Sequence, residues 1–382
     1  MKTLAALLTS LLLAACASPP PMPPVESLFD DSVFEAASAP IDRAAALALS
    51  PAMRAYLAAR LPHRSAGGDR RKPLIDALYS GDLRLEYDAA VTRTAAEAFD
   101  ARSGNCLALV LMTAAFAKEL GLTVRYQTVI GDDAWDRADG LYIAIGHVNL
   151  VLEPPREPGG FVVSSAATMV VDFVPPRKAN RLRTRPIDER TVVAMFLNNR
   201  AVESLVQGRP GDAYRWAREA IRTDPELTSA YLTLGVVYRQ ARRADLADAA
   251  LRRVTDREPD NLHALSNRVA VLRDLGRAAE AEALAQRVAR LEPHPPFSYF
   301  HEGQAALREG RYEAARRLFA KEVERAPYHH EFEYWLAVSH AQLHDTERAT
   351  VHLRRAMEVS TTRKDHDLYA GKLARMKALP AQ

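Results

Sequence analysis

The sequence predicts an α+β domain followed by an all-α array of repeats. In the first half, an apolar helical segment, Leu107 to Leu120, ends at Gly121, and the strand-like runs Thr123 to Ile130, Leu141 to Leu152 and Phe161 to Val174 follow. From about Val192 the chain changes to alanine- and arginine-rich amphipathic helices whose prolines recur at a fixed interval. With 382 residues the chain is too long for one ordinary core, so we expect at least two domains.

Composition and charge exclude several classes of function. Apolar residues make up 48% of the chain and charged residues 26%, which is typical of a globular protein. The 51 basic and 48 acidic residues leave a formal charge of +3, so we expect no nucleic-acid partner. Cys16 and Cys106 are the two cysteines, and their contexts differ, which argues against a structural disulfide or a cysteine-rich metal site. No motif calls for a cofactor.

The amino terminus has the form of a secretory signal peptide, residues 1–15. A positive start, Met1-Lys2, precedes an apolar run from Leu4 to Leu13 that is too short to span a bilayer. An ordinary signal peptide that ends near a cysteine is the alternative. The ending Leu13-Ala14-Ala15-Cys16 resembles the lipobox of bacterial lipoproteins, which implies cleavage before Cys16 and lipid attachment to it.

The residues around the expected lipid site indicate where the protein would be held. Ala17 and Ser18 follow Cys16 without an aspartate, and by analogy with Gram-negative lipoproteins this favours the outer membrane, with the protein facing the periplasm. Several acyl chains would anchor it firmly. The proline-rich stretch 18–24 cannot form a helix, so residues 16–27 are expected to act as an extended tether.

Cys106 is the candidate nucleophile. It follows Ser103-Gly104-Asn105 at the start of the apolar helix, where unpaired N–H groups and the helix dipole favour a thiolate. His147 on a following strand could take its proton, and Asp172 on the next could fix the imidazole tautomer. The sequence therefore predicts a Cys106, His147, Asp172 triad.

Side-chain alternation supports this grouping. His147 and Asn149 share one strand face, while Val148 and Leu150 share the other. Asp172, in an otherwise apolar strand, needs a partner, because an unpaired buried carboxylate is costly. Each member also has a structural interpretation: a buried apolar cysteine, a hydrogen-bonded strand histidine, or an aspartate paired with Arg177 or Lys178.

These residues resemble the transglutaminase-like superfamily, which shares the papain-type cysteine hydrolase core. The resemblance is carried by Gly104-Asn105-Cys106-Leu107-Ala108, Gly146-His147-Val148-Asn149-Leu150, Val171-Asp172-Phe173, and upstream Leu85-Glu86-Tyr87-Asp88 and Thr92-Arg93-Thr94-Ala95. It covers roughly Leu28 to Pro175 and is similar to the bacterial branch that couples such a domain to tetratricopeptide repeats.

An oxyanion hole is needed for this chemistry. The backbone N–H of Cys106 is one expected donor. Asn105 or Tyr87 is a candidate for the second donor, Asn149 faces the same site, and Trp135 is a candidate for the substrate entrance. The loop aspartates Asp132, Asp133, Asp136 and Asp139 compete with Asp172 as orienter, although we favour solvated positions for them. Residues 132–140 lack the spacing and closing glutamate of a calcium-binding EF-hand loop, and we expect no metal.

The expected first domain spans residues 28–190, with a core at 102–176. Helices are predicted in Ile41 to Leu61, with a break at Ser50-Pro51, in Pro73 to Tyr79 and in Thr92 to Phe99, packed against the Cys106 helix. The basic segment Arg177 to Arg190 is interpreted as a solvated connector rather than a lipid-phosphate contact.

The second half shows a 34-residue period. Prolines fall at 225, 259, 293 and 327, and alanines at 213, 247, 281, 315 and 349. This is the tetratricopeptide period. The clearest repeat has Tyr231, Leu234, Gly235, Tyr238, Ala247, Leu251 and Pro259 at the pattern's positions. We expect about five repeats over 192–361 and a polar capping helix over 364–380.

Two functions follow from these features. The first is an envelope lipoprotein with thiol-dependent acyl transfer, as a protease, amidase or transamidase, and a solenoid that docks a protein or peptide. The second is a non-catalytic repeat scaffold in envelope assembly, with a degenerate transglutaminase-like domain. A bracing or dimerising role is the alternative for the solenoid itself.

Overall fold

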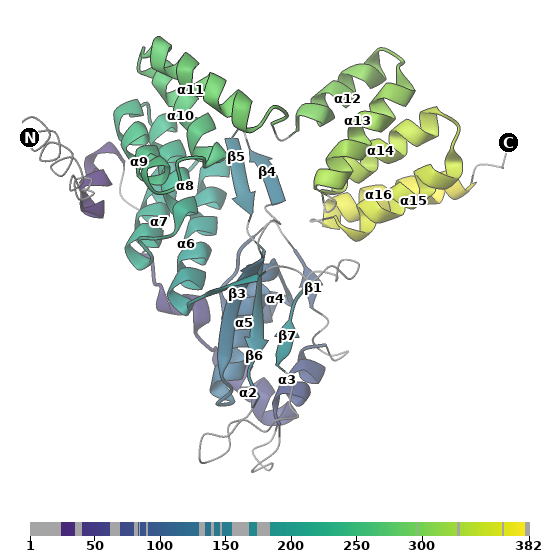
Figure 1. Cartoon of the computed structure of the whole chain (residues 1–382). Coiled ribbons are helices and arrows are strands. Elements are labelled where there is room, and N and C mark those ends of the chain that lie inside the picture. Colours follow the sequence, from purple (N-terminus) through teal and green to yellow (C-terminus); the bar gives the residue numbers. More distant parts are fainter. Residues whose placement is uncertain are drawn as a thin grey trace, which may run out of the picture.

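The computed structural model describes most of the chain as two helical bodies and an α+β domain (Figure 1). The described residues are 24–34, 40–61, 69–79, 83, 85–88, 91–129, 134–138, 141–145, 147–154, 168–173, 184–295, 297–326, 329–360 and 363–378. The expected signal peptide, Cys16 and most of the tether lie outside these ranges, so they stay predictions.

The first domain surrounds one helix, α5, that is buried over most of its length. Its elements before the sheet are η2 Val25–Leu28, η3 Asp31–Val33, η4 Ala44–Leu47, α2 Pro51–Arg60, α3 Arg71–Leu78, β1 Glu86–Tyr87, α4 Ala95–Ala101, β2 Ser103–Gly104 and α5 Cys106–Glu119. Every residue of α5 from Cys106 to Ala117 is buried, because α3 and α4 pack against the helix together with the sheet. Among the described residues, no helix is both long and apolar enough to cross a membrane.

Residues with good capping side chains stand at the starts of α2 and α4. Ser50 caps α2 with Pro51 in the first turn, as the predicted break at Ser50-Pro51 requires. Thr94 and Glu97 form a reciprocal capping box on α4. The polypeptide leaves α5 through Gly121, whose φ of 75° suits glycine.

The central sheet has four antiparallel strands in the order β7-β6-β3-β8. The strands are β3 Val124–Val129, β6 Val148–Leu152, β7 Met169–Val171 and β8 Thr184–Ile187. Helix α5 lies against β3 and β6, and all five residues of β6 are buried. The sheet thus brings the start of β6 and the end of β7 close to the start of α5.

Three sequence expectations about strands are wrong in detail. The run from Leu141 to Leu152 is divided into β5, Leu141–Ile145, and β6, and His147 lies in the connection between them. The expected loop before His147 contains a further strand, β4 Ala134–Ala138, which pairs with β5. Asp172 follows β7 rather than lying inside a strand. Hydrophobic alternation did not show where the chain turns.

The helical half is a tetratricopeptide-like solenoid of antiparallel helix pairs. Its helices are α6 Glu189–Val206, α7 Pro210–Thr223, α8 Thr228–Gln240, α9 Ala244–Arg257, α10 Leu262–Asp274, α11 Ala278–Leu291, α12 Ser298–Arg308, α13 Tyr312–Arg325, α14 His330–Gln342, α15 Thr346–Glu358 and α16 Arg363–Ala378. Gly235 lets α8 and α9 approach closely, because a Cβ there would lie 2.7 Å from Cγ of Leu251.

The solenoid is divided after α11. One continuous cluster of buried side chains runs from Leu28 to Val271, whereas those of α12–α14 form a separate cluster around Phe319. The connection contains Pro293, Pro295 and Phe297, and Phe297 has a φ of 65°, a left-handed conformation uncommon for a non-glycine residue. Figure 1 shows the two groups of helices apart on either side of this connection.

The segment before the first domain is attached to the repeats. Phe34 stacks on Tyr214 of α7 with ring centroids 4.5 Å apart. The Tyr214 hydroxyl donates to Asp31 at 2.8 Å, and the Tyr238 hydroxyl donates to the carbonyl of Leu28 at 2.8 Å. Residues 25–34 therefore connect the expected tether directly to the solenoid.

Candidate functional site

Cys106 is the first residue of α5. Its residue exposure is 7%, and its thiol is free. Gly104, two residues earlier, is closely packed: a Cβ there would lie 2.8 Å from Cβ of Ala108. Cys106 therefore lies in a tightly packed first helical turn, at the positive end of the helix dipole.

His147 and Asp172 are in direct contact. Nε2 of His147 lies 2.9 Å from both carboxylate oxygens of Asp172. Because this carboxylate occupies Nε2, Nδ1 is the ring nitrogen that remains for the Cys106 thiol, which lies near enough to act on the pKa of the ring. The three residues of the predicted triad are thus brought near one another, and Asp172 is the carboxylate that contacts the ring among the described residues.

The electrostatics of the site favour an imidazolium. Burial alone would lower the pKa of His147, but hydrogen bonds to Asp172 and Cys106 and the negative charges of both raise it to about 10. At neutral pH the ring therefore holds its proton beside the sulfur. An imidazolium stabilises an adjacent thiolate, which is the nucleophilic form of cysteine.

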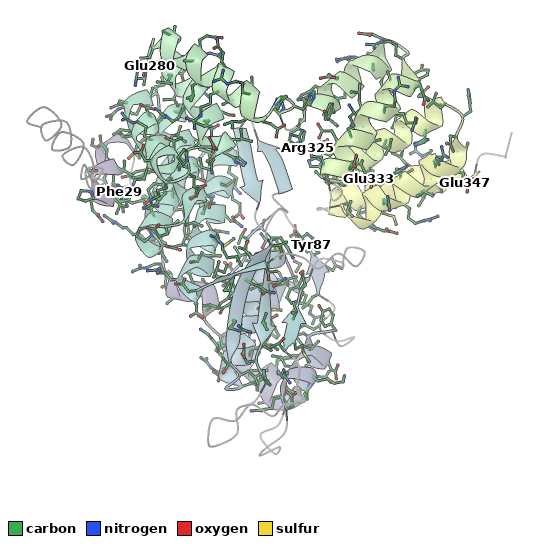
Figure 2. All side chains as sticks on the ribbon, viewed as in Figure 1. Phe29, Tyr87, Glu280, Arg325, Glu333 and Glu347 are labelled. Atoms are coloured by element: carbon green, nitrogen blue, oxygen red, sulfur yellow. The ribbon has the colours of Figure 1, made fainter. Side chains whose placement is uncertain are left out.

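Tyr87 also lies close to Cys106. Strand β1 pairs in parallel with β2, which places Tyr87 opposite Gly104. Both the backbone and the side chain of Cys106 act on the pKa of the tyrosine hydroxyl. Burial, and then the charges of Cys106 and Asp172, raise the pKa of Tyr87 well above its usual range, so the hydroxyl keeps its proton. The residue is 40% exposed, and Figure 2 shows it at the edge of the α+β domain nearest the helical bodies.

Two other predicted site residues have different positions from those expected. Asn105 caps α5: its Oδ1 accepts from the N–H of Ala108 at 2.9 Å, and its Nδ2 donates to the Thr92 hydroxyl at 2.8 Å. With both ends of its amide engaged, it is not placed to stabilise an oxyanion. Asn149 is 2% exposed and donates to Asp172 at 3.1 Å, so it holds the carboxylate rather than facing a substrate.

The remaining predicted residues are only partly described. Trp135 lies in β4, but its side chain is outside the described residues, as are Asp132, Asp133 and Asp139. Within the described part of the chain, no group of three or more histidine, cysteine, aspartate or glutamate side chains is placed to hold a metal ion.

Sequence reasoning missed one contributor to the site, Thr92. This residue is 1% exposed, it lies between β1 and α4, and its hydroxyl holds Asn105. Thr92 belongs to a run that carries the resemblance to the transglutaminase-like superfamily, but its contacts with Asn199 and Glu203 join residues more than a hundred positions apart. No local pattern indicates them.

Comparison with known proteins identifies the helical half. The family model of the tetratricopeptide repeat matches residues 228–261. The carboxy-terminal half of this chain contains tetratricopeptide repeats. No curated protein sequence matches the chain.

Solved structures of repeat proteins are similar to this tetratricopeptide-repeat half. MamA 41-end from Desulfovibrio magneticus RS-1 is 19% identical with a TM-score of 0.27, over 45% of this chain and 96% of that one. YrrB, described as a TPR protein with an unusual peptide-binding site, is 22% identical with a TM-score of 0.26, over 47% of this chain and 92% of that one.

Proposed function

We propose that the protein is a thiol-dependent acyl-transfer enzyme of the transglutaminase-like type, coupled to a tetratricopeptide solenoid that docks a protein or peptide. The observation that carries the proposal is the position of His147, whose ring lies between the Cys106 thiol and the Asp172 carboxylate. A nucleophile, a base and an orienting carboxylate in contact are the elements of cysteine hydrolase catalysis.

The proposed reaction has two steps. The Cys106 thiolate attacks an amide or peptide carbonyl, and the imidazolium of His147 gives its proton to the leaving amine as the C–N bond breaks. The resulting thioester is then attacked by water or by an amine, from which His147 takes a proton, and the thiolate is released. Water makes the protein a protease or amidase, and an amine makes it a transamidase.

Tyr87 and the backbone N–H of Cys106 are the proposed oxyanion donors. Both lie at the start of α5, and the raised pKa of Tyr87 keeps its O–H available as a donor. A carbonyl oxygen entering between them would accept from both donors, and the tyrosine O–H would then stabilise the developing negative charge.

The location of the protein forms part of the proposal. Lipid attached to Cys16 would hold the protein at the outer membrane of a Gram-negative bacterium, facing the periplasm. Mass spectrometry of the mature amino-terminal peptide tests this directly. Recovery of an unacylated Cys16 peptide, or an unchanged membrane fraction for Cys16→Ser, would contradict it.

Alkylation of Cys106 by iodoacetamide tests the enzymatic proposal, because the reaction follows the thiolate. An ordinary thiol that ionises near pH 8.5 loses roughly two orders of magnitude in rate between pH 9 and pH 6. We expect the alkylation rate of the wild-type protein to fall much less between these two pH values. In His147→Ala the rate should fall as much as it does for an ordinary thiol. Equal pH profiles for the two proteins would refute an activated pair.

A non-catalytic scaffold is the second candidate, and it is favoured by the repeats and by the small exposed fraction of Cys106. The two candidates differ in what Cys106→Ala does to a strain that depends on the protein. Full complementation by this variant would support the scaffold, whereas loss of complementation with normal protein levels would support the enzyme.

A further inference from the structure

Helix α6 of the first repeat contacts Thr92 at three polar groups. The backbone N–H of Thr92 donates to Oε1 of Glu203 at 2.6 Å. Its carbonyl oxygen accepts from Nη1 of Arg200 at 3.4 Å, and its hydroxyl accepts from Nδ2 of Asn199 at 3.3 Å. Every hydrogen-bonding group of Thr92 thus has a partner on the solenoid.

Thr92 in turn holds the cap of the cysteine helix. The same hydroxyl accepts from Nδ2 of Asn105, and this bond fixes the orientation in which Oδ1 of Asn105 caps the N–H of Ala108. Cys106 and Leu107 are the two residues between the cap and Ala108. A short chain of buried hydrogen bonds therefore leads from the first repeat to the turn that carries the sulfur.

The contact also reaches the strand that carries Tyr87. Arg93, next to Thr92, pairs with Asp88 at 2.8 Å, and the backbone N–H of Asp88 donates to the carbonyl of Gly104 at 3.0 Å. Glu203 is half-buried near Arg93 and pairs with Arg200 at 3.5 Å. The start of α5 and the strand that carries Tyr87 are thus both supported from α6.

We propose that Glu203 of the first repeat is a positioning residue for Cys106, acting through Thr92 and Asn105. The proposal rests on the proposed function, because positioning matters for a nucleophile that must meet an imidazole and a carbonyl at once. It gives the solenoid a second role beside docking: α6 is part of the support of the site. A displacement of α6 would therefore change the reactivity of the Cys106 thiol.

The experiment compares pairs of variants by the rate of Cys106 alkylation at pH 6 and pH 9. Thr92→Val removes the hydroxyl that holds Asn105, and Thr92→Ser keeps it. Glu203→Leu removes the acceptor for the Thr92 N–H, and Glu203→Gln keeps an acceptor oxygen. We expect Thr92→Val and Glu203→Leu to lower the ratio of the alkylation rate at pH 6 to that at pH 9 by at least about fivefold relative to the wild type. Small displacements of a reacting group slow its reaction strongly. The serine and glutamine variants should retain most of the rate.

Glu322→Leu is the matched control. Like Glu203, Glu322 accepts a backbone N–H, from Phe300 to its Oε1 at 3.3 Å, and it is 1% exposed, but it lies in the separate helical body beyond α11. It should lower stability without changing alkylation. Folded Thr92→Val with the wild-type pH profile overturns the proposal, and so does an equal effect of Glu322→Leu. If Glu203→Leu does not fold, Thr92→Val and Thr92→Ser decide.

Failure of the positioning proposal and failure of the proposed function give different results. If the wild-type thiol itself behaves as an ordinary one, the enzyme is excluded and so is a positioning role. If the wild-type thiol is activated but remains so in folded Thr92→Val, only the role of α6 is excluded.

Discussion

Nε2 of His147 lies at the same distance, 2.9 Å, from both carboxylate oxygens of Asp172. A single N–H cannot point directly at two oxygens, so the ring nitrogen is shared between them. This arrangement fixes the ring plane and leaves Nδ1 towards Cys106. Asn149 holds one of the same oxygens at 3.1 Å, which prevents the carboxylate from turning.

Asp172→Asn should lower the pKa of His147. Burial by itself lowers this pKa, and the aspartate is one of the two partners that raise it to about 10. Because the folded value lies above the unfolded value of about 6.5, the proton bound by His147 stabilises the fold below pH 6.5, and this contribution disappears as the pH rises through 10. Proton titration of labelled histidines by NMR should show a His147 midpoint well below that of the wild type.

Glu333→Gln is the control for that titration. Glu333 is bound to Nδ1 of His352 at 2.7 Å in the distant helical body. Its replacement should leave the His147 midpoint unchanged. A His147 midpoint that is the same in Asp172→Asn and the wild type would mean that the aspartate does not control the charge of the ring.

Tyr87→Phe should slow acylation of Cys106 by about a hundredfold to a thousandfold, the usual effect of removing one oxyanion donor. The measurement is the initial release of nitrophenol from p-nitrophenyl acetate. Tyr79→Phe is the matched control, because Tyr79 stacks on Phe173 with centroids 6.2 Å apart and keeps that contact as phenylalanine. Equal rates for Tyr87→Phe and Tyr79→Phe would remove Tyr87 from the proposed oxyanion site.

The sequence predicts the site better than it predicts what supports it. Cys106, His147 and Asp172 belong to elements that follow each other closely, and a helix beside antiparallel strands brings their ends together. Thr92 and Glu203 are 111 positions apart, and nothing in either local pattern indicates their contact.

The division of the solenoid was also invisible in the sequence. Pro293 keeps the 34-residue spacing, so the period continues unbroken. The left-handed backbone of Phe297 nevertheless changes the direction of the chain. The spacing of the prolines carries no information about backbone conformation, so it does not predict this change.

Gly235→Ala should destabilise the first helical body by roughly 1–3 kcal/mol, the usual cost of an added methyl group in a packed core. The new Cβ would lie 2.7 Å from Cγ of Leu251, so α8 and α9 must separate. Gly371→Ala in α16 is the opposite case, because no atom lies within 4 Å of its Cβ and alanine favours a helix. Urea unfolding should show a loss for the first variant and none for the second.

Phe319→Ala should destabilise only the helices beyond α11. Phe319 is fully buried among Phe300 and Trp335, in a cluster separate from the core that contains Leu251, and its truncation should cost about 3–5 kcal/mol. Hydrogen exchange read by mass spectrometry should then rise in residues 298–342 while residues 189–271 keep wild-type protection. Leu251→Ala should give the reverse pattern. Neighbouring repeats unfold cooperatively when their buried side chains are in contact. If exchange rises equally in both bodies in either variant, the two bodies unfold together despite their separate cores, and this prediction is wrong.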